Sequence, residues 1–374
     1  MQQCYTGPCR VNDRHVHTQK IKTWILPGWK QGVFGALFAL FILNPFRSRS
    51  QDIHFSHIHA SPTLINPALT GLFNGQVRFA ANYRSQWQSF DKGYQTMAGA
   101  ADMKLVGLGR KDVLAGGLQL FSDKAGDLNF RTNSAALSFS VLKALDRRGT
   151  NVVSLGIQNA FTNQSLNYAN IIAFDEEPAI AAGATNSIGY WDVSAGLSWF
   201  SAIDKNSYFY LGAAMFHINR PLVSFLEREK NVTDASLLER RLVLHGGADI
   251  KLGRYSTVKP SVLYMNQGPH QEITMGSFWK FKRDDGLHYD GPMALYLGAW
   301  MRYQIGENGF NRDALIGAVR MDINQTMMTF TFDLNASGLS RVSYGRGGPE
   351  LSIVHILDWP REKRRKSRLK CPDL

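Results

Sequence analysis

The stretch that decides the fold is Val77-Arg-Phe-Ala-Ala-Asn-Tyr-Arg-Ser-Gln-Trp87. Residues of one parity are apolar: Val77, Phe79, Ala81, Tyr83 and Trp87. Residues of the other parity are mainly polar: Arg78, Asn82, Arg84 and Gln86. Because successive residues of a strand face opposite sides of a sheet, this stretch predicts a β-strand with one apolar and one polar face.

The same alternation recurs along the rest of the chain, in segments separated by turns rich in Gly, Asp, Asn and Pro. We count fourteen segments, which begin near residues 77, 94, 113, 129, 152, 190, 207, 240, 258, 271, 293, 313, 326 and 349. An even number of strands of about ten residues is typical of a transmembrane β-barrel. Segments 113–121, 208–216 and 293–301 alternate poorly.

The lengths of the connections give an independent test of the barrel. Outer-membrane barrels have short periplasmic turns and longer outer loops. The two longest connections, 163–189 and 217–239, are the fifth and seventh, whereas the short connections 202–206, 253–257 and 323–325 are the sixth, eighth and twelfth. If the first strand rises from the periplasm, the long loops face outward. The sequence then predicts that both termini of the mature chain are periplasmic.

The alternative fold is a soluble β-sandwich, whose strands also alternate. A sandwich buries its apolar face in a dry core, whereas a barrel turns that face to lipid. Aromatic residues gather at the ends of the expected strands, as interfacial girdles require: Tyr83, Trp87, Tyr94, Tyr190, Trp191, Trp199, Trp279, Trp300 and Tyr303. We therefore predict an all-β fold, an antiparallel transmembrane β-barrel of about fourteen strands over residues 77–358.

Composition excludes several classes of protein. A chain that is 44% hydrophobic and 19% charged is not intrinsically disordered, and a mean hydropathy of −0.21 excludes a bundle of membrane-spanning helices. Residues 1–50 and 361–370 each carry seven basic residues and one acidic residue, whereas residues 51–360 hold 28 basic and 27 acidic residues. The net charge of +12 therefore belongs to the two ends and indicates no nucleic-acid-binding face.

The first fifty residues have the layout of a secretory signal peptide. Three lysines precede the apolar run 33–43, and Ser48-Arg49-Ser50 places small residues before Gln51. We predict cleavage between Ser50 and Gln51, the alternative being a buried helix or an anchor. Cleavage leaves Cys371 as the one cysteine of the mature chain, so that no internal disulfide can form.

The start of the mature chain carries a recognisable motif. Residues 52–75 read Asp-Ile-His-Phe-Ser-His-Ile-His-Ala-Ser-Pro-Thr-Leu-Ile-Asn-Pro-Ala-Leu-Thr-Gly-Leu-Phe-Asn-Gly, and residues 82–87 read Asn-Tyr-Arg-Ser-Gln-Trp. This pattern resembles the opening of the PorP/SprF family of type IX secretion system outer-membrane proteins. The matching residues are Phe55, Ser61, Pro62, Asn66, Pro67, Gly71, Asn82, Arg84 and Trp87. The ending, 333–339, 345–352 and Cys371-Pro372, agrees with the family too.

The resemblance implies a non-enzymatic outer-membrane barrel that serves type IX secretion and gliding, with no cofactor. Such a protein supports the export or surface anchoring of a large adhesin with a type B C-terminal domain, or couples to the periplasmic secretion ring or its lipoprotein subunits. The alternative from another class is a passive channel for hydrophobic or small polar solutes.

Residues 51–76 are too interrupted by Pro, Asn and Gly to form a strand or a long helix. Asn66-Pro67-Ala68-Leu69 predicts a single helical turn with proline at its first position. A barrel of about fourteen strands has a lumen wider than side chains fill, so a plug or a bound peptide is expected. The segment is then either a plug in the barrel or an ordered periplasmic strap.

The tail, residues 359–374, is basic. It carries Arg361, Lys363, Arg364, Arg365, Lys366, Arg368, Lys370 and Cys371. The tail has three interpretations: it binds anionic lipid headgroups, it docks an acidic periplasmic partner, or it is solvated. The family resemblance favours the partner. Cys371 is then either a free thiol or the site of an intermolecular disulfide.

Other candidate sites are weak. His54, His57 and His59 do not share one side of an extended chain, and a structural metal site needs about four converging ligands. The acidic run 175–177 lacks the spaced ligands of a calcium loop, and the glycine-rich run 345–348 lacks the strand and helix of a phosphate loop. We predict neither a metal site nor a catalytic site.

Overall fold

The computed structural model describes residues 52, 55, 56, 60–86, 93–108, 111–126, 129–166, 186–204, 207–225, 236–253, 255–282, 293–306, 309–337 and 346–358. All of these belong to the unit formed by residues 49–374. The signal peptide, the cleavage site at Ser50 and Gln51, Trp87 and the basic tail lie outside the described residues. In the described part of the chain, no helix has the length and apolar character needed to cross a membrane.

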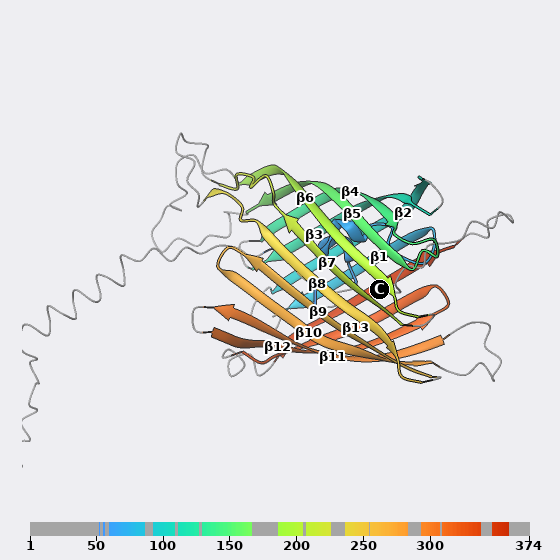
Figure 1. Cartoon of the computed structure of the whole chain (residues 1–374). Coiled ribbons are helices and arrows are strands. Elements are labelled where there is room, and N and C mark those ends of the chain that lie inside the picture. Colours follow the sequence, from blue (N-terminus) through green and yellow to red (C-terminus); the bar gives the residue numbers. More distant parts are fainter. Residues whose placement is uncertain are drawn as a thin grey trace, which may run out of the picture. The chain divides into compact units, whose positions relative to one another are not determined.

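The described chain forms one closed antiparallel barrel (Figure 1). Its fourteen strands are β1 (Val77–Gln86), β2 (Tyr94–Gly107), β3 (Val113–Ala125), β4 (Phe130–Ala144), β5 (Asn151–Ser165), β6 (Ser187–Ala202), β7 (Tyr208–Phe216), β8 (Arg241–Lys251), β9 (Ser256–Gln267), β10 (His270–Lys282), β11 (Met293–Gly306), β12 (Gly309–Ile323), β13 (Thr326–Asn335) and β14 (Arg346–Leu357). Each strand pairs with its neighbours in sequence, and β1 closes the barrel on β14 in the register Val77↔Leu357 to Arg84↔Glu350. The predicted fold class is confirmed.

The expected strands and the observed strands correspond one to one. The largest difference is at β12, which begins at Gly309 rather than near residue 313. Two short helices, α2 (Pro62–Ile65) and η1 (Pro67–Leu69), precede β1. Alternation, together with the spacing of the turns where alternation is poor, therefore located the strands. The Pro-Ala-Leu turn formed where proline at a first helical position predicts it.

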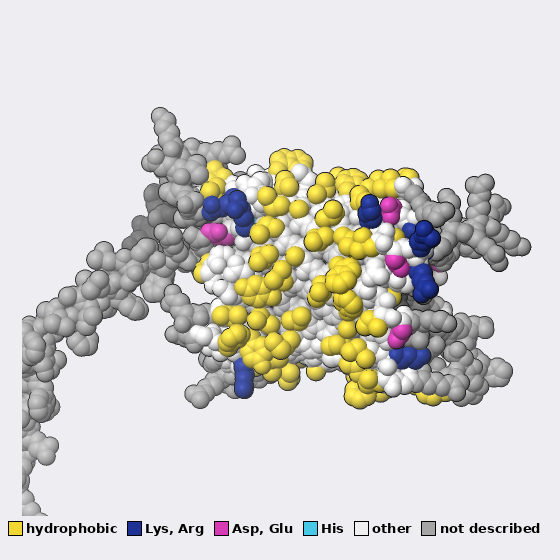
Figure 2. Space-filling model, viewed as in Figure 1, with side chains coloured by type: hydrophobic (Ala, Val, Ile, Leu, Met, Phe, Trp, Pro, Cys, Tyr) yellow, Lys and Arg dark blue, Asp and Glu magenta, His cyan; other side chains and the backbone are white. Residues whose placement is uncertain are grey.

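The two faces of the wall have opposite polarity. Phe79 and Tyr83 of β1 are 46% and 38% exposed, whereas Arg78 and Arg84 are each 4% exposed. Figure 2 shows apolar side chains covering the middle of the outer wall, with charged side chains towards its two ends. This is the arrangement of a barrel in lipid, so the sandwich alternative is wrong.

The connections divide between two rims. We call the rim with the odd-numbered connections the odd rim and the opposite one the even rim. The two long connections, 166–186 and 217–240, both belong to the odd rim, and the short turns 203–207, 252–255 and 324–325 belong to the even rim. The two long connections and the three short turns therefore lie on the rims that the sequence predicts, but the odd rim also has the short connections 268–269 and 307–308, and the even rim has the longer connection 283–292. The rim that faces the periplasm stays a prediction.

The poorly alternating segments are apolar on the lumen face as well. Tyr296 and Trp300 of β11 are buried inside the barrel, where both rings pack edge-on against Phe278 of β10, with centroids 5.8 and 4.6 Å apart. They belong to an apolar cluster formed by Ala214, Phe216, Val243, Leu263, Phe278, Ala294, Tyr296, Trp300, Ala314, Ile316 and Ala318. One side of the lumen is thus filled by side chains from β7 to β12.

Candidate functional site: a plugged lumen

The N-terminal segment lies inside the barrel. We call residues 61–73 the plug core and residues 52–60 the N-terminal arm. Eleven plug-core residues are buried: Ser61, Pro62, Thr63, Asn66, Pro67, Ala68, Leu69, Thr70, Gly71, Leu72 and Phe73. Several of them form hydrogen bonds with side chains or main-chain carbonyls of the strands, as described below. Of the two interpretations of this segment, the geometry is that of a plug.

Asn66 ties the turn of the plug core to three strands. Its Nδ2 donates to the carbonyl of Leu197 in β6 at 2.9 Å and to that of Ala213 in β7 at 3.3 Å, and lies 3.0 Å from Nε2 of His245 in β8. Its Oδ1 accepts from the Ala68 amide at 2.8 Å, which caps η1. The Asn66 amide group thus fixes the turn against β6, β7 and β8, and its carbonyl oxygen caps η1.

Glycines of the wall let the plug core approach closely. Gly156 of β5 faces the Pro67–Ala68 peptide, and a Cβ at Gly156 would overlap the Pro67 main chain. Gly196 of β6 faces the side chain of Asn66, and a Cβ at Gly196 would overlap Oδ1 of Asn66. A residue without a Cβ permits such close approach of a backbone or a side chain. Sequence reasoning missed these glycines, although their position on the polar parity of the strands was a usable signal.

Hydroxyl groups line the same part of the wall. Ser154 of β5 donates to the carbonyl of Ala68 at 2.6 Å, and Ser140 of β4 donates to that of Thr70 at 2.6 Å. The Thr70 hydroxyl in turn donates to Ser138 at 3.0 Å. A buried carbonyl without a partner is costly, so these serines stabilise the plug core in one position.

An ion pair joins the plug core to the first hairpin. Arg78 of β1 donates through Nε and Nη2 to the two carboxylate oxygens of Asp102 in β2, at 2.9 and 2.8 Å. Nη2 also donates to the Leu69 carbonyl at 3.1 Å, and Asp102 accepts from the Gly71 amide at 2.7 Å. Both side chains are buried. The ion pair and the plug core therefore stabilise each other through these hydrogen bonds.

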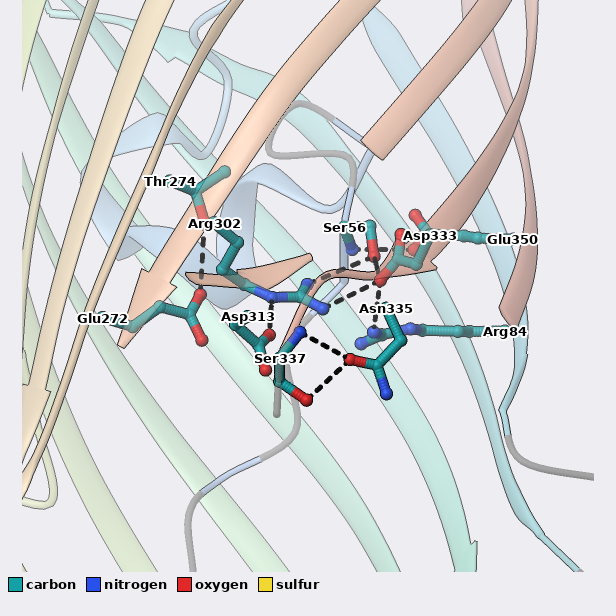
Figure 3. Close-up of polar contacts among 10 residues, drawn as sticks. All are labelled: Ser56, Arg84, Glu272, Thr274, Arg302, Asp313, Asp333, Asn335, Ser337 and Glu350. Carbon is teal, nitrogen blue, oxygen red and sulfur yellow. Dashed lines mark hydrogen bonds and ion pairs between the residues drawn. The ribbon is translucent and has the colours of Figure 1, made fainter. Parts of the chain in front are cut away.

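A second charged cluster, formed by residues of β1 and of β11 to β14, contacts the arm at Ser56 (Figure 3). Asp333 of β13 accepts from Nη2 of Arg84 at 3.0 Å and from Nη2 of Arg302 at 2.9 Å. Arg302 of β11 also donates to Asp313 at 2.6 Å. Ser56 of the arm enters this cluster, since its hydroxyl donates to Asp333 at 2.7 Å and its amide donates to Glu350 at 2.7 Å.

The arm ends at the odd rim. The Asp52 carboxylate lies 2.5 Å from Nε2 of His217 and 3.2 Å from Nη1 of Arg241. The main-chain amide of Asp52 donates to Oε1 of Gln267 at 3.0 Å. These partners follow β7, begin β8 and end β9, whereas Leu357 ends β14 at the even rim. The two described ends thus lie at opposite rims. The two ends of the mature chain lie outside the described residues, so the placement of both termini in the periplasm stays a prediction.

The charges around His217 favour its protonated form. Burial alone would lower the pKa of His217, but the carboxylates of Asp52 and Asp192 outweigh it and raise this pKa to about 9. Nδ1 of His217 lies 3.0 Å from Asp192 of β6. Burial likewise opposes ionisation of Asp52, but His217 and Arg241 hold the pKa of that carboxyl well below its usual range. The four groups form a charged latch for the tip of the arm.

We expect the latch to loosen above about pH 9. The raised pKa of His217 contributes stability that is complete below its ordinary value of 6.5 and is lost as the pH rises through about 9. The lowered pKa of Asp52 contributes stability that is lost in acid. Amide hydrogen exchange at Asp52, corrected for base catalysis, should accelerate roughly tenfold as the pH rises through about 9, and exchange at Ala68 should not. The same acceleration in the variant His217→Gln would contradict the assignment of this change to His217.

Comparisons with known proteins agree with the barrel and its motif. Residues 47–354 match the family described as "Type IX secretion system membrane protein PorP/SprF". The chain belongs to the PorP/SprF family. It is accordingly an outer-membrane β-barrel associated with type IX secretion.

Solved structures similar to this PorP/SprF protein are distant. The toluene transporter TbuX from Ralstonia pickettii has a TM-score of 0.43 and 10% identity, over 79% of this chain and 92% of TbuX. CdiB from Acinetobacter baumannii has a TM-score of 0.41 and 10% identity over 75% of this chain, which spans 60% of CdiB. Proteins of curated function gave no significant match. These likenesses are too remote to carry a functional argument.

The PorP/SprF motif residues of the described chain gather around the plug. Pro62 begins α2, Gly71 adopts the left-handed backbone angle φ +73°, and Asn82 of β1 donates to the Ser61 hydroxyl at 2.5 Å. Arg84 belongs to the charged cluster, and Phe55 is half-buried in the arm. The three histidines of the arm lie outside the described residues, and among those described no cluster of three His, Cys, Asp or Glu residues suits a metal ion.

Proposed function

We propose that this PorP/SprF protein is a binding component of type IX secretion. It supports the export or surface anchoring of a large adhesin with a type B C-terminal domain, or couples the outer membrane to the periplasmic ring or its lipoprotein subunits. Its function is binding rather than catalysis. The observation that carries the proposal is the plug core, which is fixed inside the lumen by hydrogen bonds to β1, β2, β4, β5, β6, β7 and β8.

A plug of this kind supports binding over conduction. Its backbone packs directly against Gly156 and its Asn66 side chain packs against Gly196, and the other side of the lumen holds the apolar cluster around Trp300. A passive channel needs an aqueous path through the barrel, whereas a tether needs a rigid wall and accessible rims. The long connections of the odd rim and the basic tail are then the surfaces for protein partners, and the outward apolar face binds lipid.

The proposal is tested with the native outer membrane. Deleting the gene should reduce the amount of the adhesin at the cell surface, and the full chain should co-purify with secreted or periplasmic polypeptides. Purified protein in planar bilayers should stay closed. Normal secretion without the protein, together with steady open-pore conductance of the purified barrel, would favour the passive channel and overturn the proposal.

Removal of residues 361–374 tests the tail separately. We expect this truncation to lose a periplasmic partner in co-purification while the barrel keeps its heat-modifiable migration, because the strands end at Leu357. The seven basic residues of the tail would be attracted to an acidic partner, so the loss should be reproduced by raised salt. Cys371→Ser is the matched control. Retention of the partner by the truncated chain would place docking elsewhere.

A further inference from the structure

The N-terminal arm is held differently from the plug core. The plug core packs directly against Gly156 and Gly196 of the wall, in addition to its hydrogen bonds with the strands. The arm is held at its described residues by polar groups of the wall, which contact the amide and carboxylate of Asp52 and the amide and hydroxyl of Ser56. The arm is therefore recognised as a ligand is recognised, through a few directed contacts.

The groups that hold the arm need a partner of the same chemistry. The side chains of His217 and Arg241 are each 9% exposed, so both cations are buried. Of the two carboxylates in the latch, Asp52 and Asp192, only that of Asp192 would remain near them if the arm left. Asp333 and Glu350 would each lose a donor from Ser56. Removing one partner from a buried charge is strongly unfavourable. Displacement of the arm therefore costs little free energy when another segment supplies an anion and two hydrogen-bond donors in its place.

The position of the arm suits exchange with an external polypeptide. Its tip lies at the odd rim, between the end of β7 and the start of β8, where the connection 217–240 leaves the barrel. A segment arriving at this rim meets the Asp52 contacts first and the Ser56 contacts deeper in the lumen. Exchange from the rim leaves the plug core and its contacts with Gly156 in place.

We infer that the path of the arm is a peptide-binding site, which accepts an extended acidic segment of a partner polypeptide in exchange for the arm. The segment carries a carboxylate for Arg241 and His217 and, four residues later, a hydroxyl for Asp333. This inference rests on the proposed function, since it names how a secreted partner would engage the barrel.

The test uses a labelled synthetic peptide with the sequence of residues 51–61 and the full mature protein. A tethered arm competes at an effective concentration of about millimolar. In the unmodified protein the peptide should therefore bind weakly. In the variant Asp52→Asn/Ser56→Ala the tethered arm loses the carboxylate contacts with His217 and Arg241 and the hydroxyl contact with Asp333, and keeps its main-chain amide contacts. The peptide should therefore bind this variant roughly tenfold or more tightly.

Two controls make the result specific. A peptide with the same two changes, at the positions of Asp52 and Ser56, should bind the variant roughly tenfold less well. Adding Arg241→Gln to the variant should remove the gain. Equal binding of both peptides, or no saturable binding, would overturn the inference. Neither outcome would contradict the proposed function, which is tested by the amount of adhesin at the surface of cells that lack the gene. Failure of the inference is therefore distinguishable from failure of the proposed function.

Discussion

Replacement of Gly156 by leucine is expected to open the barrel to ions. A Cβ at this position overlaps the main chain of Pro67 and Ala68, which cannot rotate away as a side chain can. Overpacking of this kind typically costs about 1–3 kcal/mol, and here it acts against the contacts that fix Asn66 and Ala68. We expect the plug core to leave its place and planar bilayers to show steady conductance where the unmodified protein is closed.

Gly317→Leu is the matched control. It places the same side chain in β12, where a Cβ meets no atom within 4 Å, between the lumen-facing Ile316 and Ala318. This control should stay closed and keep its heat-modifiable migration. A closed Gly156→Leu barrel with normal migration would show that the contact with the plug core is not what closes the lumen.

Arg78→Met is expected to cost about 3–5 kcal/mol of unfolding free energy, because it leaves the buried Asp102 carboxylate without its cation. The double variant Arg78→Met/Asp102→Leu should be less destabilised than the single one, since no unpaired charge remains. The Gly71 amide and the Leu69 carbonyl lose their partners in the double variant, so recovery should be partial. Urea unfolding in lipid vesicles measures each value.

Arg147→Met is the control for this cycle. Arg147 is exposed in the turn between β4 and β5, and a surface substitution should change stability by less than about 0.5 kcal/mol. If the effects of Arg78→Met and Asp102→Leu simply add, the coupling between the two side chains is negligible. The ion pair would then not be the connection between the plug core and the first hairpin.

The candidate site was predictable in part. Asn66 and Pro67 are recognisable because a side-chain cap and a proline act within three residues of chain, and η1 formed there. The wall contacts of Asn66 come from Leu197, Ala213 and His245. No local pattern encodes contacts at such separations. The alternation likewise does not distinguish Arg78 and Asp102, whose contacts with the plug core form only in the closed barrel, from other polar residues of the strands.

Two further features depended on tertiary structure. Tyr296 and Trp300 spoil the alternation of β11 because they pack against Phe278 inside the lumen, so they are apolar where the pattern expects a polar residue. The path of the arm placed Asp52 beside His217 at the odd rim. A sequence pattern predicts whether a residue faces the lumen or the lipid. It does not predict which segment or side chains fill the lumen.

The sequence by itself determined the strand number, the closure into a barrel and the outward direction of the apolar face. These follow from strand length and from a repeat of two residues, which most of the strands show clearly and β3, β7 and β11 show poorly. The tertiary structure alone decided that residues 61–73 lie in the lumen and which wall groups hold them. The physical reason is that a closed wall brings distant strands around one enclosed volume, where buried charges and amides must find partners across it.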